Sequence, residues 1–206
     1  MKYIIASDLH GSAYYCEMFL GAIGRENADK IIFLGDILYH GPRNNLPRDY
    51  APKKVIEMLN PLAEKMFCVR GNCDCEVDEM VLAFPCLAEY ALIGGEKRTI
   101  FASHGHKFGK DNPPPLGKGD ILLCGHTHVP ALEKFGNDNI YLNPGSLSIP
   151  KEGSAHSYMT LDDGVLVWKN LDGGAEYRRF ERVFAGGSGG RRLLSAAFHG
   201  RRIFYG

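Results

Sequence analysis

The segment YIIASDLHG, residues 3–11, places a short apolar run directly before an aspartate and a histidine that are two residues apart. An apolar run of four or five residues is typical of a buried strand. Four more runs, at 31–34, 66–69, 99–102 and 121–124, are followed by polar side chains in the same way, namely by Asp36, Asn72, His104, and the pair His126 and His128. Because the carboxyl ends of strands in an α/β sheet gather the chemistry at one edge, these five runs predict a single site.

The three segments that follow the first three runs have the apolar spacing of amphipathic helices, at 15–23, 52–62 and 77–84. The third of these places Val77, Met80, Val81 and Phe84 on one face. The second half of the chain changes character and predicts strands at 99–103, 121–125, 140–143, 157–162 and 165–169. A βα half followed by a β-rich half predicts two sheets packed face to face with helices outside them.

Length and composition fit one globular domain, or one domain with an appendage, since the chain has 206 residues and is 45% apolar. We predict that the domain spans 1–184. The remaining segment, 185–206, starts with Ala-Gly-Gly-Ser-Gly-Gly, continues with four arginines, and is predicted to be a flexible tail.

The charge balance argues against a nucleic-acid partner. The chain has 24 basic and 24 acidic residues, but four of the basic ones lie in the tail, so residues 1–184 carry a net charge of −4. A nucleic-acid-binding surface is normally a basic stripe. No apolar run approaches the roughly 20 residues of a membrane helix, and the first one is too short for a signal peptide. We therefore expect a cytoplasmic protein with no membrane partner and six reduced cysteines, and leave open whether it forms a homo-oligomer.

The residues after the five runs offer four imidazoles and three oxygen-bearing side chains, and they are Asp8, His10, Asp36, Asn72, His104, His126 and His128. Mixed nitrogen and oxygen ligands suit Mn, Fe, Ni or Zn better than Mg or Ca. Seven ligands are too many for one ion, whereas two ions about 3.5–4 Å apart would use them all. Each residue alone could equally be an ordinary cap or turn residue, but seven of them at five strand ends favour a metal site.

The order D-x-H, G-D, G-N-x-D, G-H, G-H-x-H resembles the calcineurin-like metallophosphoesterase family, and most closely its small bacterial phosphodiesterase branch. The resemblance runs from residue 1 to about 170. It implies a four-layer α-β-β-α sandwich with two mixed β-sheets and a dinuclear metal site. It also implies two divalent ions, with Mn²⁺ preferred over Ni²⁺, Fe²⁺ or Zn²⁺.

The resemblance also assigns the ligands. Asp8, His10 and His128 would hold the first ion, Asn72, His104 and His126 the second, and Asp36 both. Asn72 and His104 would act in catalysis as well as in metal binding.

One position departs from much of the family, in which the asparagine is followed by a histidine that protonates the leaving oxygen. Here that position is Cys73, as it is in the branch that the chain resembles. The thiol either donates the proton or only packs beside the metals. His106 and His40 are candidate substitutes for the acid, although a histidine close to a ligand can equally serve to hold that ligand in place.

Three further features lie beside these motifs. Arg43 and Asn44, in a proline-rich loop after Asp36, could bind the substrate phosphate or be ordinary solvated residues. Asp74 is expected to orient a neighbour by hydrogen bonding. The turn Asn143-Pro144-Gly145-Ser146 recurs in the resembling family and is expected to support the loop 125–128.

The motifs and the resemblance together predict a phosphoric diester hydrolase that cleaves a small phosphodiester with hydroxide activated by two metal ions. One alternative is a phosphomonoesterase that acts on a small metabolite. An alternative of a different class is a metal-free interaction scaffold with the same fold, and the complete ligand set argues against it.

Overall fold

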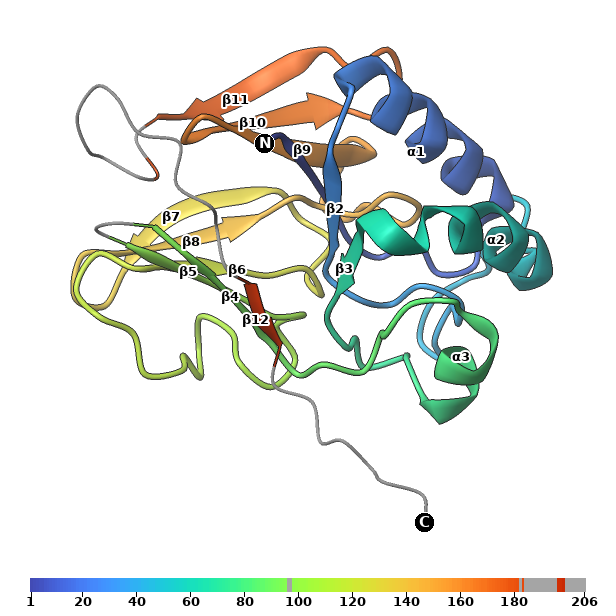
Figure 1. Ribbon diagram of the computed structural model, residues 1–206, viewed down its shortest axis with the longest axis horizontal. Coiled ribbons are helices and arrows are strands. Elements are labelled where there is room, and N and C mark those ends of the chain that lie inside the picture. The colour runs from blue at the N-terminus through green and yellow to red at the C-terminus, as the bar shows by residue number, and fades with distance from the viewer. Residues whose placement is uncertain (96–97, 182, 184–195, 199–206) are drawn as a thin grey trace.

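The computed structural model describes residues 1–95, 98–181, 183 and, for the backbone only, 196–198. Two six-stranded sheets pack face to face, and two long helices cover the outer side of one of them (Figure 1). The predicted α/β sandwich with two mixed sheets is confirmed. Within the described residues, no helix is both long enough and apolar enough to cross a membrane.

The first sheet joins the two ends of the domain. Its strand order is β11-β10-β9-β1-β2-β3, where the strands are β1 (Tyr3–Ala6), β2 (Lys30–Phe33), β3 (Met66–Cys68), β9 (Ser157–Asp162), β10 (Val165–Asn170) and β11 (Glu176–Phe180). Strands β1, β2 and β3 are parallel, so their carboxyl ends point the same way. The β9–β10 hairpin adds antiparallel strands on the other side of β1.

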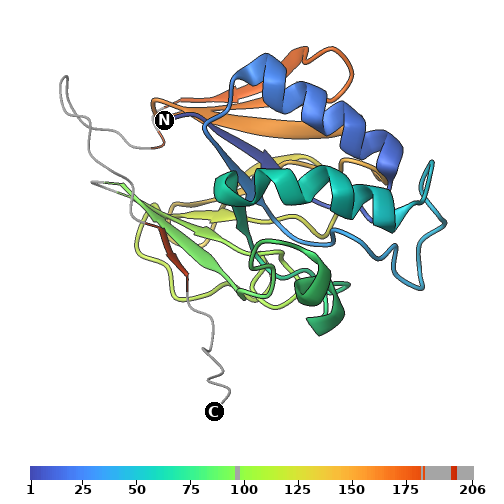
Figure 2. The ribbon, with the colours of Figure 1, turned by 45° about the vertical axis from the view of Figure 1, so that its right-hand side comes forward.

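The outer face of this sheet is covered by α1 (Ala13–Glu26) and α2 (Pro52–Leu59), which continues into a 3-10 helix at Asn60–Lys65 (Figure 2). The first helix begins at Ser12, whose hydroxyl accepts a hydrogen bond from the backbone N–H of Tyr15. Alternation along β1 then sets the packing, because Ile4 faces the helices while Ile5 faces the second sheet.

The second sheet has the order β12-β4-β5-β6-β8-β7, made of β4 (Ala91–Gly94), β5 (Thr99–Ala102), β6 (Ile121–Leu123), β7 (Ala131–Phe135), β8 (Asn139–Asn143) and β12 (Ala196–Phe198). Strands β5, β6 and β8 are parallel. The outer face of this sheet carries Phe101, Leu122 and Tyr141, and Phe108 and Leu116 from the loop 103–119 pack against them. This loop therefore covers the outer face of the second sheet.

The prediction for the third helix was right in its spacing but wrong about its packing. The helix α3 (Glu76–Val81) leaves Val77 63% and Met80 83% exposed. With six residues it is too short to cover a sheet. What it buries is the capping carboxylate of Asp78, which accepts a hydrogen bond from the Cys75 backbone N–H at 2.9 Å.

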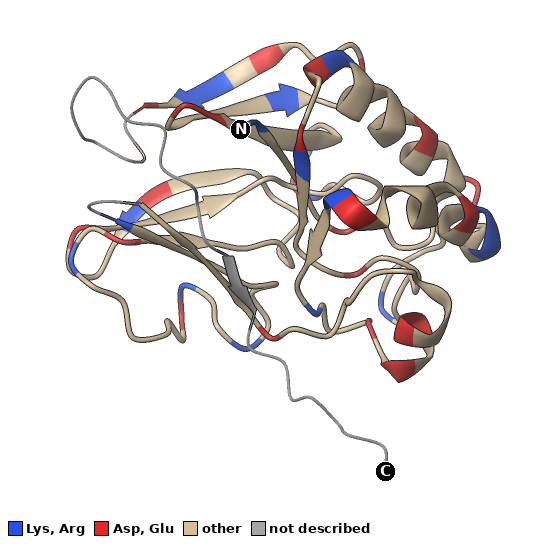
Figure 3. Ribbon diagram, viewed as in Figure 1, with Lys and Arg blue, Asp and Glu red and all other residues tan. Residues whose placement is uncertain are grey.

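Strands β4, β7 and β11 were not predicted from the sequence. The predicted domain boundary at 184 and the flexible tail 185–206 stay predictions, because most of that segment lies outside the described residues. The part that is described, Ala196–Phe198, pairs antiparallel with β4. Basic and acidic residues are interspersed along the ribbon, and acidic residues lie on α3 (Figure 3).

Glu26, at the end of α1, ties the helix to the first sheet. Its carboxylate accepts hydrogen bonds from the Nζ atoms of Lys2 (2.8 Å) and Lys169 (2.7 Å) and from the Tyr158 hydroxyl (2.8 Å). Burial alone would raise the pKa of Glu26, but the hydrogen bonds from Lys169, Lys2 and Tyr158 lower it to about 2.

We expect Glu26→Gln to lower the thermal midpoint at neutral pH by an amount that disappears in acid. A carboxyl whose folded pKa lies below its unfolded value stabilises the fold above the unfolded pKa of 4.5, and this stabilisation is lost as the pH falls toward about 2. The measurement is the midpoint of wild type and variant from pH 7 to pH 2, with exposed Glu57→Gln as the matched control. A difference that stays constant across this range would contradict the assignment.

Candidate metal centre

The five predicted strand ends meet between the two sheets. The loops after β1, β2 and β3 carry Asp8 and His10, Asp36, and Asn72, while the loops after β5 and β6 carry His104, and His126 with His128. The structure brings all seven side chains together. Five of them are buried, whereas Asn72 is exposed and His126 is half-buried, so the cluster opens to solvent on that side.

The backbone of these loops is unusual. Five of the seven residues have positive φ angles, namely Asp8 (58°), His10 (50°), Asp36 (57°), His126 (66°) and His128 (63°). Residues other than glycine rarely adopt this conformation, and such strain concentrates at functional sites. Gly71 lets the loop after β3 approach Asp36 closely, because a Cβ there would overlap the Asp36 carboxylate.

One group of ligand atoms lies around Asp8. Its Oδ1 atom is 3.2 Å from His128 Nε2 and 3.7 Å from His10 Nε2. The two histidine Nε2 atoms are themselves 3.3 Å apart. The members of this group are those expected for the first ion.

A second group lies around His104. Its Nε2 atom is 3.1 Å from Asn72 Oδ1 and 3.2 Å from His126 Nδ1. This is the set expected for the second ion.

Asp36 lies between the two groups. Its Oδ2 atom is 3.7 Å from His10 Nε2 in the first group and 3.4 Å from His104 Nε2 in the second. Its other oxygen accepts a hydrogen bond from the backbone N–H of Cys73 at 2.8 Å. The Asp36 side chain is therefore held in place and faces both groups.

The hydrogen bonds of the histidines show that the set fits metal ions. The Nδ1 atoms of His10, His104 and His128 lie 2.8, 2.6 and 2.6 Å from the backbone carbonyl oxygens of Tyr39, Leu34 and Ile149. A carbonyl accepts only, so Nδ1 carries a proton in each of the three, and Nε2 is the nitrogen that faces the cluster and is left to bind a metal ion once it carries no proton. This arrangement, in which the outer nitrogen is fixed by a hydrogen bond, is typical of metal-ligating histidines. Divalent ions with a preference for mixed nitrogen and oxygen ligands fit here.

The charges of the cluster depend on one another. Burial alone would raise the pKa of Asp8, but the imidazoles of His128, His104 and His10 lower it. Burial alone would lower the pKa of His104, yet Asp36 and Asp8 raise it to about 9. Ligand imidazoles must lose their extra proton to bind metal, so metal binding here is expected to weaken in acid.

Asp74 holds the loops that carry Asp36 and Asn72. It is buried, and its carboxylate accepts the backbone N–H groups of Asp36 (2.8 Å), Ile37 (2.9 Å) and Gly71 (2.7 Å). Burial and the neighbouring Asp36 raise the pKa of Asp74 to about 6. Asp74 therefore orients its neighbours as expected, because its single carboxylate joins the loop that carries Asp36 to the loop that carries Asn72.

The turn after β8 supports the remaining loops, as the sequence predicted. The Asn143 amide donates to the Gly125 carbonyl (2.7 Å) and to the Thr127 hydroxyl (3.0 Å). The Ser146 hydroxyl donates to the Asp8 carbonyl at 2.8 Å. Ser148, which sequence reasoning missed, donates to the same carbonyl at 3.1 Å.

Cys73 lies at the edge of the cluster. Its sulfur accepts a hydrogen bond from the Asn72 amide at 3.2 Å, and a Cβ on Gly41 would lie 3.1 Å from it. The loop after β2 therefore packs on the thiol. Burial and then the charge of Asp36 raise the pKa of Cys73, so the thiol stays protonated at neutral pH.

The two candidate histidines lie in different places. The ring of His106 lies beside the ligands, with its centroid 5.4 Å from that of His104 and 6.2 Å from that of His126. Burial, followed by the charges of His104 and His126, lowers the pKa of His106 to about 4. His40 packs instead between the rings of Tyr39 and Tyr50.

The predicted substrate-binding residues are less closely tied to the cluster. Arg43 is exposed, and the Asn44 amide donates to the His40 carbonyl within the same loop at 2.8 Å. Their phosphate-binding role stays a prediction.

Comparison with known proteins places this geometry in a family. The model of the calcineurin-like phosphoesterase superfamily domain matches residues 1–163. The chain is 49% identical over 166 residues to phosphodiesterase YfcE of Escherichia coli K12, which covers 81% of this chain and 90% of that protein. A solved structure of YfcE, described as a phosphoesterase from E. coli, matches with a TM-score of 0.83 and 46% identity over 87% of this chain and 98% of the other. A predicted phosphoesterase from Streptococcus pneumoniae, 22% identical, shares the fold with a TM-score of 0.53 over 88% of this chain and 97% of the other.

The chain belongs to the calcineurin-like phosphoesterase superfamily. The predicted resemblance is confirmed, and so is the predicted enzyme class, a hydrolase of phosphoric esters and not a scaffold.

Proposed function

We propose that this protein is a Mn²⁺-dependent phosphodiesterase with a dinuclear metal centre. The observation that carries the proposal is the position of Asp36, whose carboxylate faces the Asp8 group on one side and the His104 group on the other. The proposed ligands are those of the two groups: Asp8, His10 and His128 for one ion, Asn72, His104 and His126 for the other, and Asp36 for both. Such ions, when bound, supply an activated water and neutralise the charge of the phosphoryl oxygens.

The chain's own residues position the reactants. Asn72 and His126 are the solvent-accessible members of the cluster, so the phosphate is expected to enter on their side. Arg43 is exposed in the loop that packs on Cys73, so its guanidinium can donate two hydrogen bonds to a bound phosphate. Asn44 stabilises that loop, because its amide donates to the His40 carbonyl. The six cysteines are all free thiols, which supports the proposal of a reducing, cytoplasmic setting.

The name of the E. coli relative supports the proposed preference for diesters, and the acid position adds a preference for good leaving groups. A protonated thiol with a raised pKa is a weak proton donor at neutral pH, and His106, with a pKa of about 4, is neutral there. A poor leaving group is therefore hardly protonated as it departs, and the loss of general acid catalysis typically lowers the rate by about 10²–10⁴-fold. The E. coli relative, 49% identical, is named a phosphodiesterase.

The test compares a diester and a monoester that share one leaving group. Loaded with Mn²⁺, the protein should hydrolyse bis-p-nitrophenyl phosphate well above p-nitrophenyl phosphate, and chelation should abolish both activities. Equal or faster turnover of the monoester would reverse the assignment and favour a phosphomonoesterase.

Cys73→Ala tests whether the thiol gives a proton. For activated aryl diesters we expect kcat/KM within a few fold of wild type, because p-nitrophenolate leaves without protonation. Cys73→His should extend activity toward monoesters, because imidazole, with a pKa near 6.5, can carry a proton at neutral pH. Both variants would be measured over a series of leaving-group pKa values. An alanine defect of about 10²-fold even on p-nitrophenyl diesters would make the thiol a general acid.

A further inference from the structure

The helix α3 presents an apolar face to solvent. Val77 is 63%, Met80 83% and Val81 40% exposed, and their spacing places all three on one side of the helix. They are three of the seven large apolar side chains that the described residues leave exposed, although α3 has only six residues. Exposed apolar side chains that gather on one element mark a contact surface, whereas single scattered ones do not.

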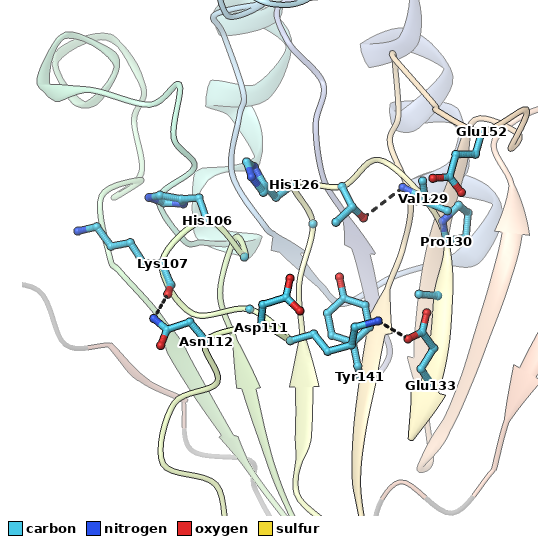
Figure 4. Close-up of a pocket in the computed structure, with 16 residues that line it drawn as sticks. His106, Lys107, Asp111, Asn112, His126, Val129, Pro130, Glu133, Tyr141 and Glu152 are labelled. Atoms are coloured by element: carbon cyan, nitrogen blue, oxygen red, sulfur yellow. Dashed lines mark hydrogen bonds and ion pairs between the residues drawn. The ribbon is translucent and has the colours of Figure 1, made fainter. Parts of the chain in front are cut away.

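The same helix is acidic (Figure 3). Glu76 and Glu79 are exposed, and neither has a salt bridge within the part of the chain that the structure describes. The lysines of the loop 103–119 are already engaged. Lys107 and Lys110 line the pocket beside His126 that Figure 4 shows, and they are paired with Glu89 and Glu133, while Lys118 is paired with Asp138. The face of α3 therefore suits a partner that is both basic and apolar.

The strand β12 directs the following residues toward this helix. It pairs antiparallel with β4, so that Ala196 lies opposite Ile93 and Phe198 opposite Ala91. The chain after Phe198 therefore continues past the start of β4, toward the segment 82–90 that joins α3 to β4. Figures 1 and 2 show β12 (dark red) and α3 on the same lower side of the molecule. An extended chain spans about 3.3 Å per residue, so residues 199–205 can cover about 23 Å.

The residues after β12 have the composition that the face of α3 requires. Residues 199–206 read His-Gly-Arg-Arg-Ile-Phe-Tyr-Gly, in which two arginines precede three large apolar residues and no acid is present. The planar guanidinium of arginine matches a carboxylate with two hydrogen bonds, and an apolar run next to it can bury exposed apolar side chains.

We propose that the segment 201–205 docks on α3 of the same chain. The two arginines pair with Glu76 and Glu79, and the Ile-Phe-Tyr run covers the apolar face. In this arrangement the flexible part of the tail is the Gly-rich stretch 185–190. The contact is independent of the proposed phosphodiesterase function, and it fastens the helix that begins four residues after the proposed ligand Asn72.

Hydrogen exchange of the α3 backbone, followed by mass spectrometry, measures whether this face is covered. A chain that stops after Phe198 keeps β12, and its α3 peptides should exchange about fivefold faster or more, because they lose the contact that holds the short helix. Met80→Gln in the full chain should reproduce part of this effect, and the truncation should then add little. Peptides from α1 and β4 are the internal control and should not change.

A pair of charge reversals separates the contact from a general effect of charge. Arg201→Glu with Arg202→Glu should speed α3 exchange as the truncation does, whereas Arg191→Glu with Arg192→Glu, before β12, is the matched control and should leave it unchanged. Equal α3 exchange with and without residues 199–206, or an equal effect of the two double variants, would overturn the docking. Protection of α3 that rises with protein concentration would place the segment on a second copy and would equally contradict a contact within one chain.

Discussion

Asp36→Ala is expected to reduce kcat/KM for bis-p-nitrophenyl phosphate by about 10³-fold or more. The Asp36 carboxylate faces both ligand groups, at 3.7 Å from His10 and 3.4 Å from His104. Losing it removes a ligand from both proposed ions. Metal ions contribute several kcal/mol of charge stabilisation in such reactions, and each 1.36 kcal/mol corresponds to about tenfold in rate.

The accompanying measurement is the amount of bound manganese, which should fall below the two ions expected for wild type. Asp172→Ala, at an exposed position in the β10–β11 turn outside the ligand set, is the control and should keep full activity and metal content. Wild-type manganese content and activity in Asp36→Ala would show that the carboxylate is not a ligand.

Asp74→Ala is expected to impair both the fold and the metal site although Asp74 is not a proposed ligand. Its carboxylate accepts three backbone N–H groups, at 2.7–2.9 Å, from Gly71, Asp36 and Ile37. Alanine would leave these donors buried without an acceptor, at a cost of about 1–3 kcal/mol for each. We also expect a loss of about 10–100-fold in metal affinity, as is typical when the support of a ligand is removed.

The conservative variant separates positioning from bulk destabilisation. Asp74→Asn keeps the side-chain shape and one acceptor oxygen, and it removes a negative charge that is disfavoured there, since burial and the neighbouring Asp36 raise the pKa of Asp74 to about 6. It should therefore recover much of the free energy of unfolding but only part of the metal affinity. Metal affinity equal to wild type in Asp74→Ala would show that the loops keep their shape without this carboxylate.

The ligand loops could be predicted from the sequence because each follows a short apolar strand in a fixed order. Every residue of the strand β1 before Asp8 and of the strand β6 before His126 is buried, so both strands consist of apolar residues and can be predicted from an apolar run alone. The support by Asn143 and Ser146 could be expected from their turn motif. The carbonyl groups of Tyr39, Leu34 and Ile149 that orient the histidines could not, because a backbone carbonyl has no sequence signature.

The missed features have physical reasons too. The strand β7 (Ala131–Phe135) has an exposed Glu133-Lys134 pair at the edge of its sheet, and β11 (Glu176–Phe180) is mostly polar and exposed, so neither shows an apolar run. The helix α3 has the apolar spacing of a packed helix but is too short to reach a core.

The central claim is that this cluster holds two metal ions that share Asp36. The most direct test is a crystal structure of the protein grown with Mn²⁺, in which anomalous scattering locates manganese. We predict two peaks about 3.5–4 Å apart, with one in contact with Asp8, His10 and His128, the other with Asn72, His104 and His126, and Asp36 in contact with both. A single peak at full occupancy, or two peaks of which Asp36 touches only one, would contradict the account.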